Sequence, residues 1–108
     1  MPYSPEVADR VRRLLAGRDD VEEKRMVGGG LSFLVAGRMC CGVTRDALMV
    51  RVGADAGPAA LAEPHVTTMT LGGRQLDGYV LVAPEGHADD AALAAWVSRG
   101  LAFVSGGG

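Results

Sequence analysis

The chain has 108 residues, of which 48% are hydrophobic and 22% are charged, and its formal net charge is −2. This length provides one domain with a single core, and the apolar content excludes a disordered chain. The small negative charge gives no general reason to bind nucleic acid or an anionic membrane. The amino terminus does not resemble a secretory signal, and no apolar run reaches the roughly 20 residues that span a membrane.

The first predicted element is an amphipathic helix that ends at Gly17. Ser4 provides a capping hydroxyl, Pro5 suits the first helical position, and Glu6 places an acid in the first turn. The spacing favours pairs four residues apart on its surface, Glu6 with Arg10 and Asp9 with Arg13. Its apolar stripe needs a sheet to cover it.

Three apolar runs between residues 31 and 53, separated by polar turns at 36–38 and 44–46, predict an antiparallel meander. A short strand at 23–27 and a glycine turn at 28–30 precede them. Alternation predicts one apolar face and one mixed face that carries Arg38, Cys40 and Arg51. The apolar face is expected to carry Leu31, Phe33, Val35, Met39, Cys41, Val43, Leu48, Val50 and Val52.

The second half of the chain predicts a short helix at 58–63, two strands at 66–71 and 79–83, and a last helix at 90–104. Asp89 is its expected cap, and residues 105–108 form a flexible glycine tail. The predicted fold class is therefore α+β, an antiparallel sheet meander flanked by N-terminal and C-terminal helices. We expect one domain over residues 1–108.

The two cysteines, Cys40 and Cys41, are adjacent, unlike the spaced cysteines of small secreted scaffolds. We therefore expect a cytoplasmic protein with reduced thiols. On a regular strand, neighbouring side chains point to opposite faces, so the two thiols are not expected to share a metal or to bond to each other. Cys41 is expected to be buried and inert, and a reactive Cys40 on the mixed face is the less favoured alternative.

Few residues suggest catalysis. The glycines at 28–30 lead into a strand rather than a helix, which favours a turn over a phosphate-binding loop. His65 and His87 lie in predicted loops without a nucleophile motif or metal-ligand spacing. We therefore expect no enzyme, no metal and no cofactor.

The best chemical hint is a pair of arginines, Arg38 and Arg51, on the predicted mixed face. Two guanidinium groups on one face are able to bind an anion or a carboxylate. The favoured alternative is that they protect the sheet and pair with Asp46 or Glu63. A denser basic cluster, formed by Arg10, Arg12, Arg13 and Arg18, is cancelled by nearby acids, so direct binding to nucleic acid is not expected.

Several segments together resemble the TfoX/Sxy amino-terminal domain. They are Lys24-Arg25-Met26 with Gly28-Gly29, then Phe33, Gly37-Arg38-Met39, Leu48, Val50-Arg51-Val52, Pro64, Met69-Thr70, Gly78-Tyr79-Val80-Leu81-Val82, and the helix with Asp89, Leu93 and Trp96. The resemblance runs from the first helix to Val104. One departure is Val27, which stands where the family usually has an aromatic residue before the glycine turn.

The family is named for bacterial regulators of natural competence, which activate transcription together with the cyclic-AMP receptor protein. Those regulators carry a second, helical carboxy-terminal domain, whereas this sequence stops at Gly108. The resemblance therefore implies a stand-alone domain that acts by protein–protein contact in transcriptional regulation. It implies a partner in the transcription machinery, leaves a homodimer open, and transfers no active site. The alternative is a small-ligand or anion-binding module that uses Arg38 and Arg51.

Overall fold

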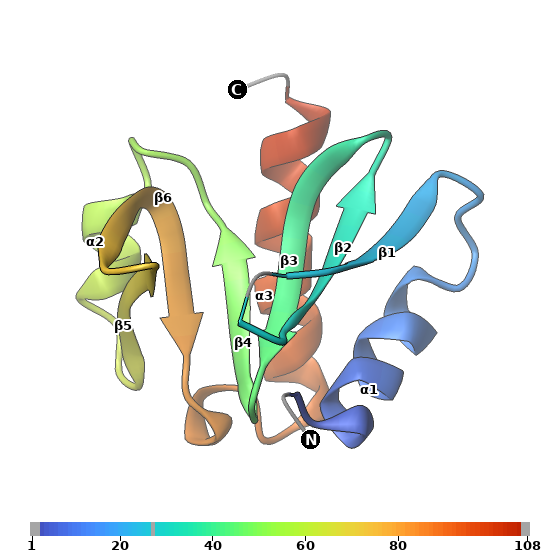
Figure 1. Ribbon diagram of the computed structural model, residues 1–108, viewed down its shortest axis with the longest axis horizontal. Helices are drawn as coiled ribbons and strands as arrows, with labels where there is room; N and C mark the ends of the chain where they lie inside the picture. Colours follow the sequence, from blue (N-terminus) through green and yellow to red (C-terminus); the bar gives the residue numbers. More distant parts are fainter. Residues whose placement is uncertain (1–2, 27, 107–108) are drawn as a thin grey trace.

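The computed structural model describes residues 3–26 and 28–106, which form one antiparallel sheet with the strand order β1-β2-β3-β4-β6-β5 (Figure 1). Helices precede, interrupt and follow the strands, as expected of an α+β fold. The elements are α1 (Pro5–Leu15), β1 (Val21–Arg25), β2 (Leu31–Val35), β3 (Arg38–Thr44), β4 (Ala47–Arg51), α2 (Gly57–Leu61), β5 (Val66–Leu71), β6 (Arg74–Val82), a 3-10 turn η1 (Pro84–Gly86) and α3 (Asp90–Ser105).

Both long helices begin at the predicted caps. The Ser4 side chain accepts a hydrogen bond from the Val7 amide at 3.3 Å. The Asp89 carboxylate accepts one from the Ala92 amide at 2.7 Å. Each cap satisfies a backbone N–H group that has no partner within its helix, so these starts follow from local chemistry.

Other elements begin or end at different residues than predicted. The first strand is Val21–Arg25 rather than 23–27, and Val27 lies outside the described residues. The strand expected at 79–83 is the longer β6, which begins at Arg74. In the predicted tail, Ser105 ends α3 and Gly106 caps it, while residues 107–108 lie outside the described part of the chain.

All three helices contribute to one hydrophobic core on one face of the sheet. From the sheet come fully buried side chains such as Phe33, Leu48 and Val50, and from α3 come Leu93 and Val97. A fully buried side chain of this size contributes about 1.5–3 kcal/mol through loss of apolar surface from water. Burial against the sheet therefore holds the helices in place.

A β-bulge in β3 overturns the predicted faces of three residues, Arg38, Met39 and Cys40. Phe33 pairs with Cys41, but the next residue, Leu34, pairs with Met39, so Cys40 is the extra residue of β3. A bulge of this kind breaks the strict alternation of side chains. Cys40 therefore joins Cys41 in the core, where both are fully buried, and Met39 moves to the opposite face with Leu34.

Candidate functional site

The face of the sheet opposite the core has no helix packed on it in the described structure, and Figure 1 shows it turned toward the viewer with α3 behind. Its side chains alternate with those of the core. Met49 pairs with Leu81, and Leu34 pairs with Met39. We call this surface the open face, and its apolar residues outside the core are Met26, Leu34, Met39, Met49, Met69, Tyr79 and Leu81.

Close contacts hold part of this methionine-rich layer in place. Met49 and Met69 are 1% and 4% exposed, although neither belongs to the core under the helices. A Cβ atom on Gly42 would lie 3.0 Å from the Met49 methyl group and 3.4 Å from the Met26 sulfur. Glycine at this position therefore leaves room over β3 for the side chains of both methionines. Methionine is flexible and polarizable, which makes such surfaces adaptable to partners.

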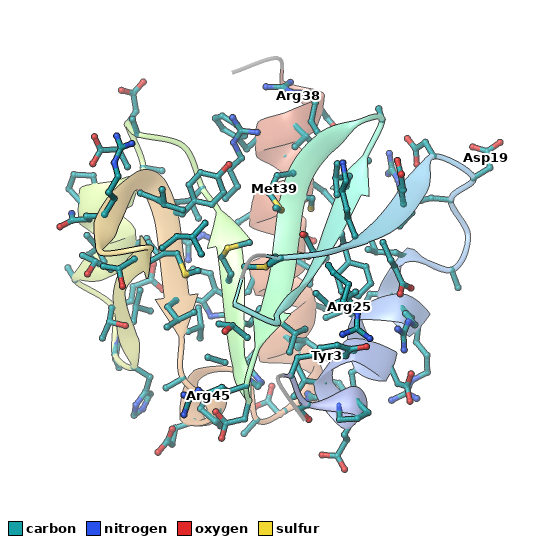
Figure 2. The ribbon with its side chains drawn as sticks, in the orientation of Figure 1. Tyr3, Asp19, Arg25, Arg38, Met39 and Arg45 are labelled. Atoms are coloured by element: carbon teal, nitrogen blue, oxygen red, sulfur yellow. The ribbon has the colours of Figure 1, made fainter. Side chains whose placement is uncertain are left out.

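The rest of the layer is accessible. Leu34, Met39, Tyr79 and Leu81 are half-buried, and Figure 2 shows Met39 on β3 near the end that carries Arg38. A hollow of about 350 Å³ lies beside Met69 and Leu81, bordered by the turn between β3 and β4. The open face thus offers partly exposed apolar side chains and a depression.

Charges of both signs surround these apolar residues. Lys24 and Glu22 lie on the open side of β1, Arg51 ends β4, and Asp46 borders the hollow. Within the described residues, neither Lys24 nor Arg51 forms an ion pair, whereas three of the observed ion pairs tie the helices to other segments. An apolar centre with a mixed polar rim is the usual composition of a protein-binding surface.

Arg38 and Arg51 both contact α3, but not in the predicted arrangement. Arg38 pairs with the core residue Val35, so it lies on the helix-covered face, and the prediction that both arginines share the mixed face is wrong. The bulge at Cys40 is the cause. Both guanidinium groups nevertheless reach the ring of Phe103 on α3, at 5.6 Å for Arg38 and 4.8 Å for Arg51.

Each arginine has a further contact. Arg38 donates a hydrogen bond to the Val104 carbonyl oxygen at 2.9 Å, which satisfies a free carbonyl in the last turn of α3. Arg51 lies 5.5 Å from the ring centre of Tyr79, its cross-strand neighbour. Figure 2 places Arg38 beside the C-terminal end of α3. Positive charge is therefore concentrated at this end of the sheet.

The expected carboxylate partners of these arginines lie elsewhere. Glu63 forms an ion pair with Arg99 at 2.8 Å. Sequence reasoning also missed Phe103 and Tyr79, which join the arginine pair. In the sequence, only their positions could have indicated a contact with the arginines. Phe103 lies in the last turn of the final helix, and Tyr79 lies in an apolar strand.

His87 is a structural residue by its contacts. Its side chain is 2% exposed, and its Nε2 atom lies 3.0 Å from the Asp46 carbonyl oxygen. Because a carbonyl only accepts, Nε2 carries the proton and donates. Nδ1 is buried without a partner among the described residues. His87 thus links η1 to the turn between β3 and β4, and His65 is exposed with a positive φ of 67°.

The thiols also differ from the predicted arrangement. The side chains of Cys40 and Cys41 both lie in the hydrophobic core rather than on opposite faces. The neighbouring Cys41 thiol lowers the pKa of Cys40, whereas the Cys40 thiol and burial raise the pKa of Cys41 well above its usual value. Complete burial keeps both away from reagents in solution.

Three of the four clustered arginines form ion pairs. Arg10 pairs with Asp90 of α3 at 3.2 Å, and Arg18 pairs with Asp20 at 3.0 Å. Arg12 contacts Asp9 and Glu23 at 2.7 Å each. The predicted pairs Glu6–Arg10 and Asp9–Arg13 are therefore wrong, because tertiary contacts and a pair three residues apart replace them.

Within residues 3–26 and 28–106, no group of three or more His, Cys, Asp or Glu side chains is placed to hold a metal ion. A sequence model of the TfoX N-terminal domain matches residues 13–104. The chain belongs to this family. No curated protein and no solved structure matches it.

The TfoX N-terminal domain match extends from the end of α1 to the last turn of α3 and includes all six strands. The open face and the cluster at Phe103 both lie within it. In the described structure no helix is long and apolar enough to cross a membrane.

Proposed function

We propose that this TfoX N-terminal domain is a non-catalytic module that acts by protein–protein contact in transcriptional regulation. The observation that carries the proposal is the open face. A sheet normally buries its apolar side chains under a second layer, and here no helix of the described structure covers the open face, where Leu34, Met39 and Leu81 remain only half-buried. A partner protein would supply it.

The composition of the open face supports a protein partner rather than a small substrate. Its half-buried residues Leu34, Met39 and Leu81 spread over three strands and do not line an enclosed cavity. Partly exposed apolar side chains of this kind, rimmed by charge, are typical of protein interaction sites.

The same contacts favour a role without catalysis. His87 directs its Nε2 proton to a backbone carbonyl, and both cysteine thiols are buried in the core. An acid, base or nucleophile has to reach its substrate, and these groups are enclosed. Membership of the TfoX N-terminal domain family supports a regulatory role in transcription, in contact with the transcription machinery.

Affinity capture with surface variants tests the proposal. The bait proteins are the wild-type chain, Met39→Glu and Leu81→Glu on the open face, and Ala95→Glu as a matched control on the exposed side of α3. We expect transcription proteins to be captured by the wild type and the control, and to be lost with both open-face variants. Equal capture by all four baits would contradict the proposal that the open face binds the partner.

An anion-binding role is the second candidate, and the shared contact of Arg38 and Arg51 with Phe103 favours it. Sulfate is expected to raise the melting temperature in proportion to ln(1 + [L]/Kd). Arg51→Gln should remove that rise, whereas Arg13→Gln, an equal charge change at an exposed position, should retain it. A rise that is identical in both variants would indicate a general salt effect.

A further inference from the structure

The two edges of the sheet differ in charge. β1 forms one edge, and four of its five residues are charged: Glu22, Glu23, Lys24 and Arg25. Arg12 of α1 also binds Glu23 through two hydrogen bonds of 2.7 and 2.8 Å. Charged side chains on an edge strand oppose pairing with another chain, so this edge is protected.

The other edge, formed by β5, lacks this protection. Its sequence is Val-Thr-Thr-Met-Thr-Leu, without a charged residue, and in the described structure it pairs only with β6. Thr67, Thr68 and Thr70 are exposed, and Leu71 is 36% exposed, which is unusual for a large hydrophobic residue of this chain. β5 therefore presents an uncharged strand with one free row of N–H and C=O groups.

The irregularity between β5 and β6 leaves this edge intact. Thr68 pairs with Val80 and Thr70 pairs with Gln75, so four β6 residues lie opposite Met69 alone. The extra residues therefore belong to β6, the inner strand. A bulge in the edge strand itself would protect it by added twist, and β5 has none.

We propose that β5 pairs in antiparallel fashion with β5 of a second copy of this chain. A two-fold axis places each strand against its own copy, so a charged residue near the axis would face the same charge in the partner strand. β5 carries no charge, and threonines near the axis would form the cross-strand pairs that stabilise sheets. With the axis perpendicular to the sheet, the helices of both copies lie on the same side.

The short helix α2 extends this surface beyond the strand. α2 contributes the buried Ala60 to the core and lies close to both β5 and β6. Its exposed residues Pro58 and Ala59, with the following Ala62, are small and uncharged. Contact between the two α2 segments would add apolar area to the strand pairing, since stable interfaces usually bury at least about 1,200 Å².

Sedimentation of the purified chain over a range of concentrations tests this proposal. We expect the wild type to reach twice the monomer mass of 11.2 kDa. Thr68→Lys and Thr67→Lys each place two like charges near the axis and should give monomers. Ser98→Lys, at an exposed position of α3, is the matched control and should remain a dimer.

Hydrogen exchange of the wild-type chain provides a second measurement that does not depend on whether the lysine variants fold. Circular dichroism identifies variants that retain the fold, and the β5 amides of the wild type should become more protected as its concentration rises. A wild type that stays monomeric at every concentration would overturn the proposal. So would folded lysine variants that still dimerise. Because no partner protein is present, failure of the regulatory proposal would not affect these measurements.

Discussion

Gly100 of α3 lies directly against Cys40 of β3. A Cβ atom at Gly100 would lie 2.6 Å from the Cys40 carbonyl oxygen and 3.0 Å from its sulfur. Only glycine allows the helix to approach the strand this closely. The contact is made at the bulge that turns Cys40 into the core, so the position of α3 and the shape of β3 depend on each other.

Gly100→Ala is therefore expected to destabilise the fold. Alanine favours an isolated helix by about 1 kcal/mol, but the clash with a backbone oxygen requires α3 to shift, at a cost of about 1–3 kcal/mol. Urea unfolding measures the net loss. Gly17→Ala is the control, since no atom lies within 4 Å of its added Cβ. Equal stability of Gly100→Ala and the wild type would contradict the close approach.

Leu93→Ala is expected to lower the free energy of unfolding by about 2–5 kcal/mol, the usual range for a buried leucine. Leu93 is 1% exposed under the sheet, whereas Leu14 on α1 is 42% exposed. Leu14→Ala should therefore cost much less. Similar losses in the two variants, measured by urea unfolding, would show that α3 does not cover the core in this way.

Both native thiols are expected to resist labelling at neutral pH. Cys40 and Cys41 are 0% exposed, so modification requires transient opening of the fold. Ser98→Cys supplies an exposed reference thiol on α3, which should react at the rate of a free cysteine. Labelling of a native cysteine as fast as this reference would contradict burial.

The Glu23–Arg12 contact predicts a small loss of stability in acid. The hydrogen bond from Arg12 lowers the pKa of Glu23 in the folded state below its unfolded value near 4.3. Stability from this contact is therefore complete above that value and is lost as the pH falls through the folded pKa. Because both side chains are over one-third exposed, the contribution is about 0.2–1 kcal/mol.

Glu23→Gln should remove this part of the pH dependence. Urea unfolding between about pH 6 and pH 3 would show a shallower decline than in the wild type. Glu6→Gln, at an exposed site without an ion pair among the described residues, serves as the control. A variant whose stability falls as steeply as that of the wild type would show that the contact contributes nothing in solution.

The isolated chain is expected to bind duplex DNA no better than about 10⁻⁴ M at physiological salt, the weak end of non-specific binding. Binding requires cations that can displace counterions from several phosphates. Arg10, Arg12 and Arg18 already contact carboxylates of the chain. Fluorescence anisotropy measures the affinity, and micromolar binding that weakens strongly with salt would contradict this expectation.

Local chemistry in the sequence by itself determined the helices, the turns and the fold class. Ser4 and Asp89 cap helices because their oxygen atoms accept from amides that have no acceptor within the helix. The turn at Gly28 and Gly29 has φ values of 93° and 103°, which glycine adopts readily. Such features involve neighbouring residues, so they can be read without knowing the rest of the fold.

Only the tertiary structure decided which side chains meet at the candidate sites. The bulge at Cys40 depends on how β2 and β3 pair. It places Met39, Cys40 and Arg38 on faces that strict alternation does not predict. Arg38 and Arg51 share a contact with one ring because α3 brings Phe103 to the end of the sheet. Strand register and helix docking depend on packing between distant segments, and a one-residue shift reverses every side chain beyond it.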